Sequence, residues 1–148
     1  MYRYLWICAL LVVGFCFVTG CSDKVQLKGK VTFSDNGEPL KKGTVIFESD
    51  TFMSRGSIQS DGTFVVGSMG EKDGIPKGDY RITIIGAMDT IEDPNAKKDS
   101  AMSGVYTAAP LINTYLIDRK YEEVSKSGLT FTVDGSKKEC LLTVDRSK

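Results

Sequence analysis

The sequence contains no histidine, the residue that most often serves as a general base and as a ligand of transition metals. Its four cysteines include no Cys-x-x-Cys pair, which argues against a thiolate zinc site. Neither sign of charge is in excess, because 19 basic residues face 19 acidic ones. This balance gives no indication of a nucleic acid or of an anionic membrane surface as a partner. From these absences we expect no cofactor and no metal.

The chain also lacks any stretch in which apolar residues recur with a sustained helical period. It is rich in glycine, with 15 such residues, and in the β-branched and aromatic residues that favour strands. A length of 148 residues is typical of one domain. The composition therefore favours a single all-β domain.

Residues 1–20, MYRYLWICALLVVGFCFVTG, form an apolar leader whose only charge is Arg3. A basic start, an apolar run and a close of small or polar residues are the three parts of a secretory signal peptide. The run is short for a membrane span of roughly 20 residues. Cys8 and Cys16 lie inside the leader and are interpreted as small apolar residues. The alternative is an N-terminal anchor that stays uncleaved.

The leader closes on the tetrapeptide VTGC, which resembles the bacterial lipobox. Val18 is the aliphatic residue, Thr19 and Gly20 are the small neighbours, and Cys21 is the cysteine to be modified. In lipoprotein precursors of this kind the thiol receives a diacylglyceryl group, and a signal peptidase then cuts directly before it. The resemblance therefore implies cleavage between Gly20 and Cys21 and lipidation of Cys21.

Two or three acyl chains on Cys21 would hold the protein stably at a membrane, whereas a single chain gives only marginal binding. Residues 21–24 would then be the lipidated N-terminus and a short tether. Ser22 follows the cysteine, and an aspartate comes one place later, at Asp23. In Gram-negative lipoproteins an aspartate directly after the cysteine favours the inner membrane. We therefore expect this protein in the bacterial cell envelope, at the outer membrane or cell surface.

After the leader, short alternating segments are separated by turn signals such as DNG at 35–37. Asp61-Gly62 is the strongest hairpin signal and predicts two short paired strands around it. The side chains expected to face the core are Val31, Phe33, Val45, Phe47, Phe64, Val66, Tyr80, Ile82, Ile84, Leu129, Phe131, Val133, Cys140, Leu142 and Val144. About seven such strands over residues 25–146 predict an antiparallel β-sandwich, with a small barrel as the alternative.

Residues 86–113 break this pattern, because they are polar, rich in small residues and without a clear period. A structureless loop of this length is uncommon in a compact domain. We expect an irregular insertion here. It would be a disordered excursion, a binding loop or a region that hides a short strand near Val105-Tyr106.

Residues 25–146 resemble carboxypeptidase-regulatory-like domains, which have a transthyretin-like (prealbumin-like) fold. LKGKVTFSDNGEPLKKGTVIFES matches their opening pattern of G-x-V followed by G-x-P-L-x-x-G-x-V-x-F. DGTF and GIPKGDYRITI are similar to the middle of such domains, and RKYEEVSKSGLTFTV is similar to the end of small lipoproteins from planctomycete-type bacteria. The likeness departs at 86–113 and at Asp118, where a proline is more usual. It implies a sandwich that acts as an accessory, folding or binding module and is generally non-catalytic.

A histidine-free envelope enzyme is the rival functional class. Serine and threonine nucleophiles would lack a histidine base, although SKSG at 125–128 contains the letters of a Ser-Lys arrangement. The adjacent carboxylates Glu92-Asp93 and Glu122-Glu123 would point to opposite faces of a strand. Because no convergent set of nucleophile, base and oxyanion donors is visible, we expect no catalysis.

A calcium-dependent carbohydrate-binding module is a further alternative. DTIEDPNAKKD offers five oxygen ligands without the spacing or the glycine of an EF-hand, namely Asp89, Glu92, Asp93, Asn95 and Asp99. Three tyrosines in or near the insertion are candidates for contact with a sugar or a protein: Tyr106, Tyr115 and Tyr121. The sequence as a whole predicts a non-catalytic, lipid-anchored envelope protein, with a structural role or with an envelope protein or polysaccharide as its partner.

Overall fold

The computed structural model describes residues 24–67, 73–93 and 110–148. Its elements follow in the order β1 (Lys24–Val25), β2 (Lys28–Phe33), β3 (Thr44–Glu48), β4 (Met53–Ser57), β5 (Thr63–Val65), β6 (Ile75–Pro76), β7 (Gly78–Ile85), β8 (Met88–Glu92), β9 (Leu111–Tyr115), η2 (Arg119–Glu122), α2 (Val124–Ser127), β10 (Leu129–Val133) and β11 (Glu139–Val144). No helix in these ranges is long and apolar enough to cross a bilayer. Gly20 and Cys21, the predicted cleavage and lipidation site, lie outside the described residues.

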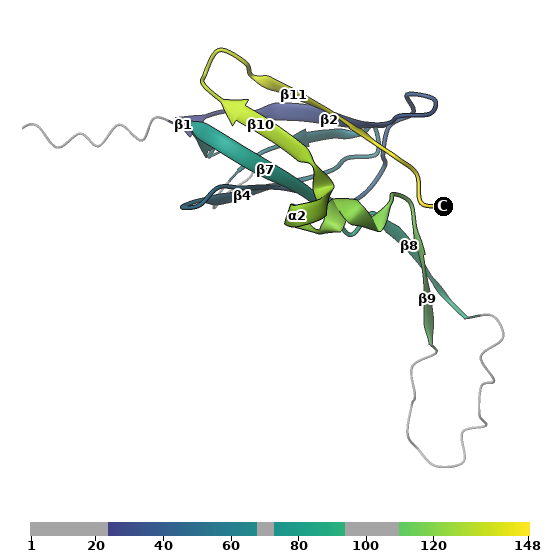
Figure 1. Ribbon diagram of the computed structural model, residues 1–148. Coiled ribbons are helices and arrows are strands. Elements are labelled where there is room, and N and C mark those ends of the chain that lie inside the picture. The colour runs from purple at the N-terminus through teal and green to yellow at the C-terminus, as the bar shows by residue number, and fades with distance from the viewer. Residues whose placement is uncertain (1–23, 68–72, 94–109) are drawn as a thin grey trace, which may run out of the picture.

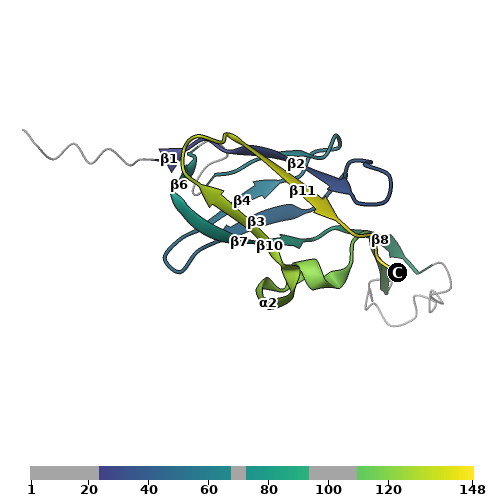
Figure 2. The ribbon, with the colours of Figure 1, turned by 45° about the horizontal axis from the view of Figure 1, so that its top comes forward.

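Two sheets form a β-sandwich, as predicted (Figures 1 and 2). One has four strands in the order β10-β7-β3-β4, and the other has three in the order β11-β2-β5. The strands of the first sheet all pair antiparallel, but β11 pairs with β2 in parallel, from Glu139↔Lys28 to Val144↔Phe33. The predicted antiparallel pairing is therefore wrong for β2 and β11. The chain crosses to the other sheet after β10 instead of turning back beside it, and strand patterns do not reveal such a crossing.

The core lies between the sheets, where the alternating side chains meet. The predicted inward residues are buried, except that Leu129 and Phe131 are only partly so. Phe47 is central, with its ring centroid 6.1 Å from that of Phe64 across the sandwich and 6.2 Å from that of Tyr80. Aromatic pairs at this separation add to the free energy that burial provides.

Strand β7 departs from alternation at one place, since Thr83 is also buried. The helical turns η2 and α2 pack against this strand, and Ser127 in α2 donates a hydrogen bond from its hydroxyl to the carbonyl of Ile82. The outer face of β7 is therefore covered at this end, which explains why its polar threonine is not exposed.

The turn at Asp61-Gly62 is present, but it does not join two strands of one sheet. β4 belongs to the four-stranded sheet and β5 to the three-stranded one, and the two meet at the isolated bridge Arg55↔Gly67. Gly62 has a φ of +81°, and a Cβ there would lie 2.8 Å from the carbonyl oxygen of Val31. The turn signal thus identified a real turn, while the predicted hairpin is wrong because the chain passes between the sheets there.

Residues 86–113 are not irregular throughout. β8 and β9 pair antiparallel, from Met88↔Tyr115 to Glu92↔Leu111, and form a two-stranded arm. Most side chains of this β8–β9 arm are exposed, so its sequence has no alternation from which the strands could be predicted. The pair Val105-Tyr106, where a short strand was one expectation, lies outside the described residues.

The sandwich contains its own core, because every buried hydrophobic residue in the described ranges lies between Leu27 and Val144. It also has two distinct ends (Figures 1 and 2). β1, where the described chain begins, pairs with β6 at one end, and the β8–β9 arm projects from the other.

Candidate functional site

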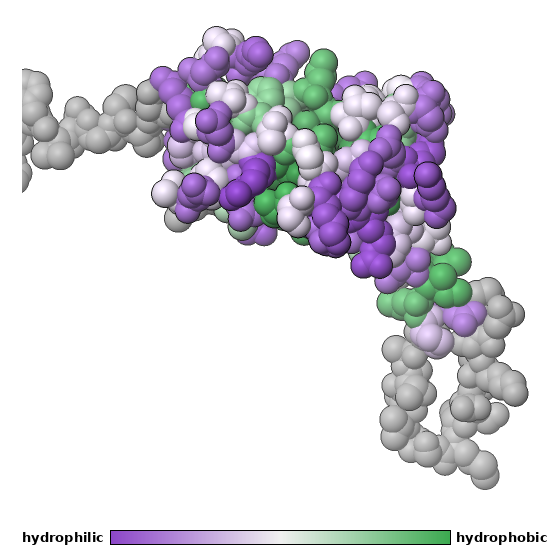
Figure 3. All heavy atoms as spheres, in the orientation of Figure 1, coloured by the Kyte–Doolittle hydropathy of each residue, from purple (hydrophilic) through white to green (hydrophobic). Residues whose placement is uncertain are grey.

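The β8–β9 arm carries apolar side chains on both of its faces. Ile91 lies directly opposite Ile112, so these two share a face, whereas Leu111 lies opposite Glu92 on the other face. Ile91 is 55 % exposed, Leu111 63 % and Ile112 41 %. Figure 3 shows a group of hydrophobic (green) residues on the projecting part of the molecule, beyond the mixed surface of the sandwich.

The base of the arm is fixed to the sandwich. The backbone N–H of Leu116 donates to the carbonyl of Ala87 at 2.9 Å, and that of Ser147 donates to the carbonyl of Leu116 at 3.2 Å. Lys42 forms an ion pair with Asp89 at 2.6 Å. The arm therefore leaves the sandwich in a defined direction, although a two-stranded ribbon alone is only marginally stable in water.

A polar network surrounds Asp145 at the same end of the molecule. Its carboxylate accepts hydrogen bonds from Lys120 at 2.6 Å, Ser34 at 2.7 Å and Tyr121 at 3.0 Å. These donors, with Lys120 the strongest, lower the pKa of Asp145 from 3.8 to about 2. The backbone N–H of Asp118 donates to the carbonyl of Asp145 at 3.0 Å, which ties β11 to the chain segment that follows the arm. Near neutral pH this carboxylate is ionised, and its oxygens accept hydrogen bonds from three side chains. These bonds give it a structural role and not that of a general acid or base.

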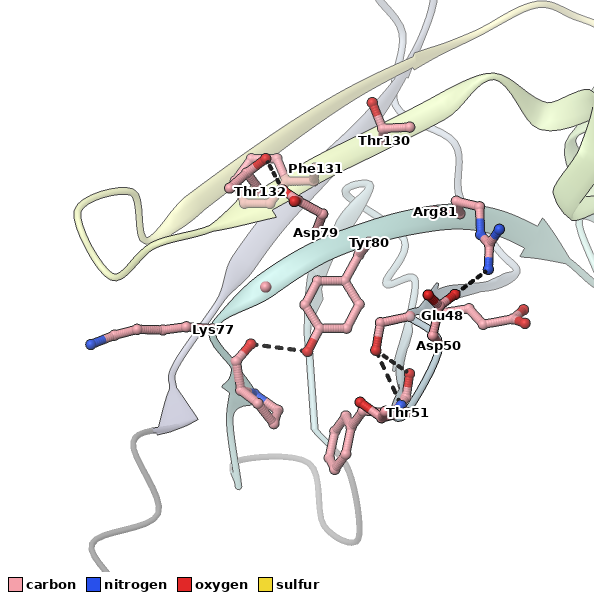
Figure 4. A pocket seen from close by; sticks show the side chains of 14 residues that line it. Glu48, Asp50, Thr51, Lys77, Asp79, Tyr80, Arg81, Thr130, Phe131 and Thr132 are labelled. Atoms are coloured by element: carbon pink, nitrogen blue, oxygen red, sulfur yellow. Dashed lines mark hydrogen bonds and ion pairs between the residues drawn. The ribbon is translucent and has the colours of Figure 1, made fainter.

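A shallow hollow of about 650 Å³ lies at the opposite end of the four-stranded sheet (Figure 4). It is lined by polar side chains of β3, β7 and β10 and by the aromatic rings of Phe52 and Phe131. Thr132 donates to Asp79 at 2.6 Å, and Arg81 pairs with Asp50 at 3.2 Å. Hydroxyl, carboxylate and guanidinium groups beside aromatic rings form a surface that suits a polar, uncharged ligand.

Tyr80 lines the same hollow, with its phenol donating to the carbonyl of Pro76 at 2.9 Å. Burial raises the pKa of Tyr80 above its ordinary value of 10.0, so the phenol stays protonated near neutral pH. It is therefore a hydrogen-bonding group and not a base.

Of the five proposed calcium ligands the structure describes Asp89, Glu92 and Asp93, and it does not group these three around a site for a metal ion. Asp89 pairs with Lys42 and shares a face with Thr114, whereas Glu92 lies on the other face with Leu111. Asn95 and Asp99 lie outside the described residues. Within the ranges that the structure describes, no group of three or more His, Cys, Asp or Glu side chains is arranged to hold a metal ion.

The other candidate residues that the structure describes serve the fold. Tyr121 is buried and bound to Asp145, and Tyr115 is partly buried beneath the guanidinium of Arg119, 4.9 Å from its ring centroid. Tyr106 is not among the described residues. In SKSG, Lys126 pairs with Glu123 at 2.8 Å, and Ser127 bonds the backbone of β7. The Ser-Lys letters thus belong to helix α2 and its packing.

No protein-family model, curated protein or solved structure matches the chain. The likeness to transthyretin-like lipoprotein domains therefore rests on the motifs quoted above. Sequence reasoning did not single out Ile91, Leu111 and Ile112. The only signal for them in the sequence is that β-branched and aliphatic residues lie near both ends of the polar stretch 86–113. This signal is weak until the pairing of β8 with β9 is known.

Proposed function

We propose that the protein is a non-catalytic, lipid-anchored component of the bacterial cell envelope, whose transthyretin-like sandwich presents the β8–β9 arm to another envelope protein. The observation that carries this proposal is the exposed pair Ile91 and Ile112, at the end of the sandwich opposite β1. Aliphatic groups gathered on an exposed surface are typical of interaction sites.

The anchor supports the direction of this arm. Cys21, which ends VTGC, lies only three residues before Lys24 in β1. An acylated Cys21 would therefore hold the β1 end of the sandwich near the membrane. The β8–β9 arm at the other end would then point away from that membrane, toward partners in the surrounding envelope.

The form of the arm favours a particular kind of partner. Because aliphatic side chains lie on both faces, a flat partner surface would cover Ile91 and Ile112 and leave Leu111 in water. A protein with an apolar cleft, into which the arm inserts, would cover both faces. Burial of aliphatic side chains of this size contributes about 1.5–3 kcal/mol each when it is complete.

Site-specific photo-cross-linking in living cells tests the binding surface. A photoreactive amino acid at position 91 or 112 should capture the same envelope protein from both positions. Leu141 is the matched control, since it is a single aliphatic residue on β11 that is 78 % exposed. The proposal fails if position 141 captures the same protein with equal yield, or if the positions on the arm capture none.

The anchor is tested separately by intact mass. The protein extracted from cells should begin at Cys21 and carry acyl mass, and Cys21→Ser should leave the leader of residues 1–20 attached. A mature chain that starts elsewhere, or one without acyl mass, would remove the anchor from the proposal.

A second candidate function is polysaccharide binding in the hollow of Figure 4, favoured by its aromatic rings, hydroxyls and paired charges. Purified domain should then bind an envelope glycan, and Arg81→Ala should weaken that binding at least tenfold. Equal binding by Arg81→Ala and the unchanged chain would assign the glycan to another surface.

A further inference from the structure

The two sheets of the sandwich are linked along one side and separate along the other. On the linked side the edge strands are β4 and β5, and Arg55 in β4 exchanges backbone hydrogen bonds of 3.1 and 3.0 Å with Gly67, just after β5. On the other side the edge strands are β10 and β11 (Figures 1 and 2). No strand pairing or bridge joins β10 to β11 within the described ranges. β11 therefore forms an open edge of its sheet.

The backbone groups on the open edge of β11 follow from its pairing with β2. The N–H of Lys28 donates to the carbonyl of Lys138 at 3.0 Å, and that of Ser34 donates to the carbonyl of Val144 at 2.9 Å. Even-numbered residues of this strand thus face β2, and the backbone groups of odd-numbered residues point away from it. The odd-numbered residues of β11 are Glu139, Leu141 and Thr143. Their N–H and C=O groups make no hydrogen bond on this open side in the described part of the chain.

The open stretch is bounded at both ends. After the strand, the next outward carbonyl is that of Asp145, which accepts a hydrogen bond from the N–H of Asp118 at 3.0 Å. Before the strand, the chain turns at Asp134, whose carboxylate accepts from the N–H of Ser136 at 2.8 Å. The open edge therefore extends over residues 139–143, which is enough for a short extended segment and leaves little freedom in its register.

This edge lacks the features by which proteins usually prevent the addition of a strand. Edge strands are commonly protected by lysines, prolines, bulges or a covering segment. Residues 139–144 are ECLLTV, with no lysine or proline, and their register with β2 is continuous. Leu141 at the centre of the open stretch is 78 % exposed. Unpaired donors and acceptors beside an exposed aliphatic side chain form a template for another strand.

The side chains along the edge indicate the chemistry of the strand that would pair with it. Charged pairs of opposite sign, aliphatic pairs and threonine pairs are favourable across neighbouring strands. A basic residue therefore suits the place opposite Glu139, an aliphatic residue the place opposite Leu141, and a threonine the place opposite Thr143. The intervening side chains would point toward β10, whose inward residues Leu129 and Phe131 are only partly buried, so these should be aliphatic too.

We propose that residues 139–143 of β11 bind an extended segment of another protein by strand addition. The segment runs antiparallel to β11, the slightly more stable sense of pairing, and has the pattern threonine, three aliphatic residues, lysine. Backbone hydrogen bonds give affinity, and the alternate side chains give specificity. This interaction goes beyond the function proposed for the β8–β9 arm and does not depend on it. Position 141 stays the control for the arm, because the chain captured there should differ from the one captured at positions 91 and 112.

Amide hydrogen exchange of the purified protein, followed by NMR, tests the proposal with the synthetic peptide Thr-Val-Leu-Val-Lys, blocked at both ends. In the free protein the amides of Glu139, Leu141 and Thr143 should exchange rapidly, and those of Cys140 and Leu142 slowly. Saturating peptide should slow exchange of the three outward amides by at least about tenfold, because each gains a hydrogen-bond partner. The two inward amides should not change.

Matched changes in the peptide separate backbone pairing from general apolar contact. A methyl group on the leucine nitrogen removes a donor that faces β11, and it should weaken binding at least about tenfold. A methyl group on the nitrogen of the first valine removes a donor that points away, and it should weaken binding by less than about threefold.

Variants of the protein test the same edge. Leu141→Pro removes an outward donor without removing a bond to β2, and it should abolish the protection by peptide. Leu141→Lys leaves the backbone unchanged and should weaken binding about tenfold, since a charge replaces the aliphatic contact. Ile112→Lys makes the same change on the arm and should leave peptide binding unchanged. Thermal unfolding of each variant shows whether the sandwich is intact.

Several results would overturn the proposal. The peptide could fail to protect the outward amides, or methylation of leucine and of valine could weaken it equally. Slow exchange of the outward amides in the free protein at every concentration would show that the edge is already covered. Protection that rises with protein concentration, together with a doubled mass in sedimentation, would assign the edge to a second copy of this chain.

Discussion

Strands β7 and β8 follow one another along the chain and both pair antiparallel, yet their surroundings are opposite. β7 buries Tyr80, Ile82 and Ile84 between two sheets, while Asp89 to Glu92 of β8 are exposed. Pairing of the backbone is therefore common to both regions, and burial is confined to one. The sandwich derives its stability from the packed faces, and the β8–β9 arm depends on the contacts at its base.

This difference separates the roles of the two regions. Side chains of the sandwich core are committed to one another, as the ring contacts of Phe47 show. Side chains of the arm have no such partners within the described part of the chain, apart from contacts at its base and along its own ribbon. Segments of this kind on a rigid scaffold are where binding residues tend to lie.

Phe47→Ala should produce the largest change. It removes a fully buried ring that touches Phe64, Tyr80 and Phe131, and the expected loss is about 3–5 kcal/mol in the free energy of unfolding. Ile112→Ala on the arm should change that free energy by less than about 0.5 kcal/mol. Urea unfolding measures both. Similar losses in the two variants would erase the distinction between sandwich and arm.

Two glycines sharpen the same comparison within the sandwich. A Cβ at Gly29 would lie 2.2 Å from Phe64 and 2.4 Å from the carbonyl of Cys140, so Gly29→Ala should cost about 1–3 kcal/mol through overpacking. Gly37 has a φ of +70° with open space around it, and Gly37→Ala should cost only about 1 kcal/mol of backbone strain. If thermal unfolding ranks Gly37→Ala as the more harmful, the close contact of β2 with β5 and β11 is misplaced.

The sandwich was largely predictable because most of its strands have one solvent-exposed face and one buried face. Alternation identified Val45 and Phe47, and it placed Cys140, Leu142 and Val144 correctly in the core. It did not predict which strands pair. The parallel pairing of β2 with β11 brings together two strands that are more than 100 residues apart in the sequence, and no local pattern contains that information.

The candidate sites were harder to predict for two physical reasons. Both faces of the arm are exposed to solvent, so the sequence around Ile91 and Ile112 shows no alternation of apolar and polar residues. Only the register of β8 with β9 shows that these two side chains lie opposite one another. The hollow of Figure 4 collects residues of β3, β7 and β10, and only the folded chain brings these together. Cys21 is different, because its motif is continuous in sequence, and its lipidation stays a prediction.

Acid should lower the free energy of unfolding through the network around Asp145, by less than the core substitution Phe47→Ala does. The pKa of Asp145 in the fold, about 2, lies below its ordinary value of 3.8, so the ionised carboxylate stabilises the fold. This contribution is complete above the ordinary pKa and is lost as the pH falls from about 4 toward 2. Asp145→Asn should flatten that part of the curve of unfolding free energy against pH. An unchanged slope in the variant would show that Asp145 does not link the C-terminal strand to Lys120 and Tyr121.

Cys140, which is fully buried in β11, should have the smallest influence on the free energy of unfolding at neutral pH. Burial raises the pKa of the Cys140 thiol from 9.0 to about 12, so the reactive thiolate is scarce. A water-soluble maleimide should label the native domain far more slowly than the urea-unfolded one. Because the folded pKa is raised, this group should also make the fold less stable as the pH rises above 9. Rapid labelling of native protein would show that β11 does not bury its thiol.

The division between a stable sandwich and a binding arm is tested most directly in a chain that carries Ile91→Asp and Ile112→Asp together. The measurement is the yield of photo-cross-linked envelope protein from position 111 in living cells, with the unfolding midpoint of the purified domain as its control. We predict that the cross-linked species disappears while the unfolding midpoint moves by only a few degrees. A cross-linked yield equal to that of the unchanged chain, with the domain still folded, would contradict the account.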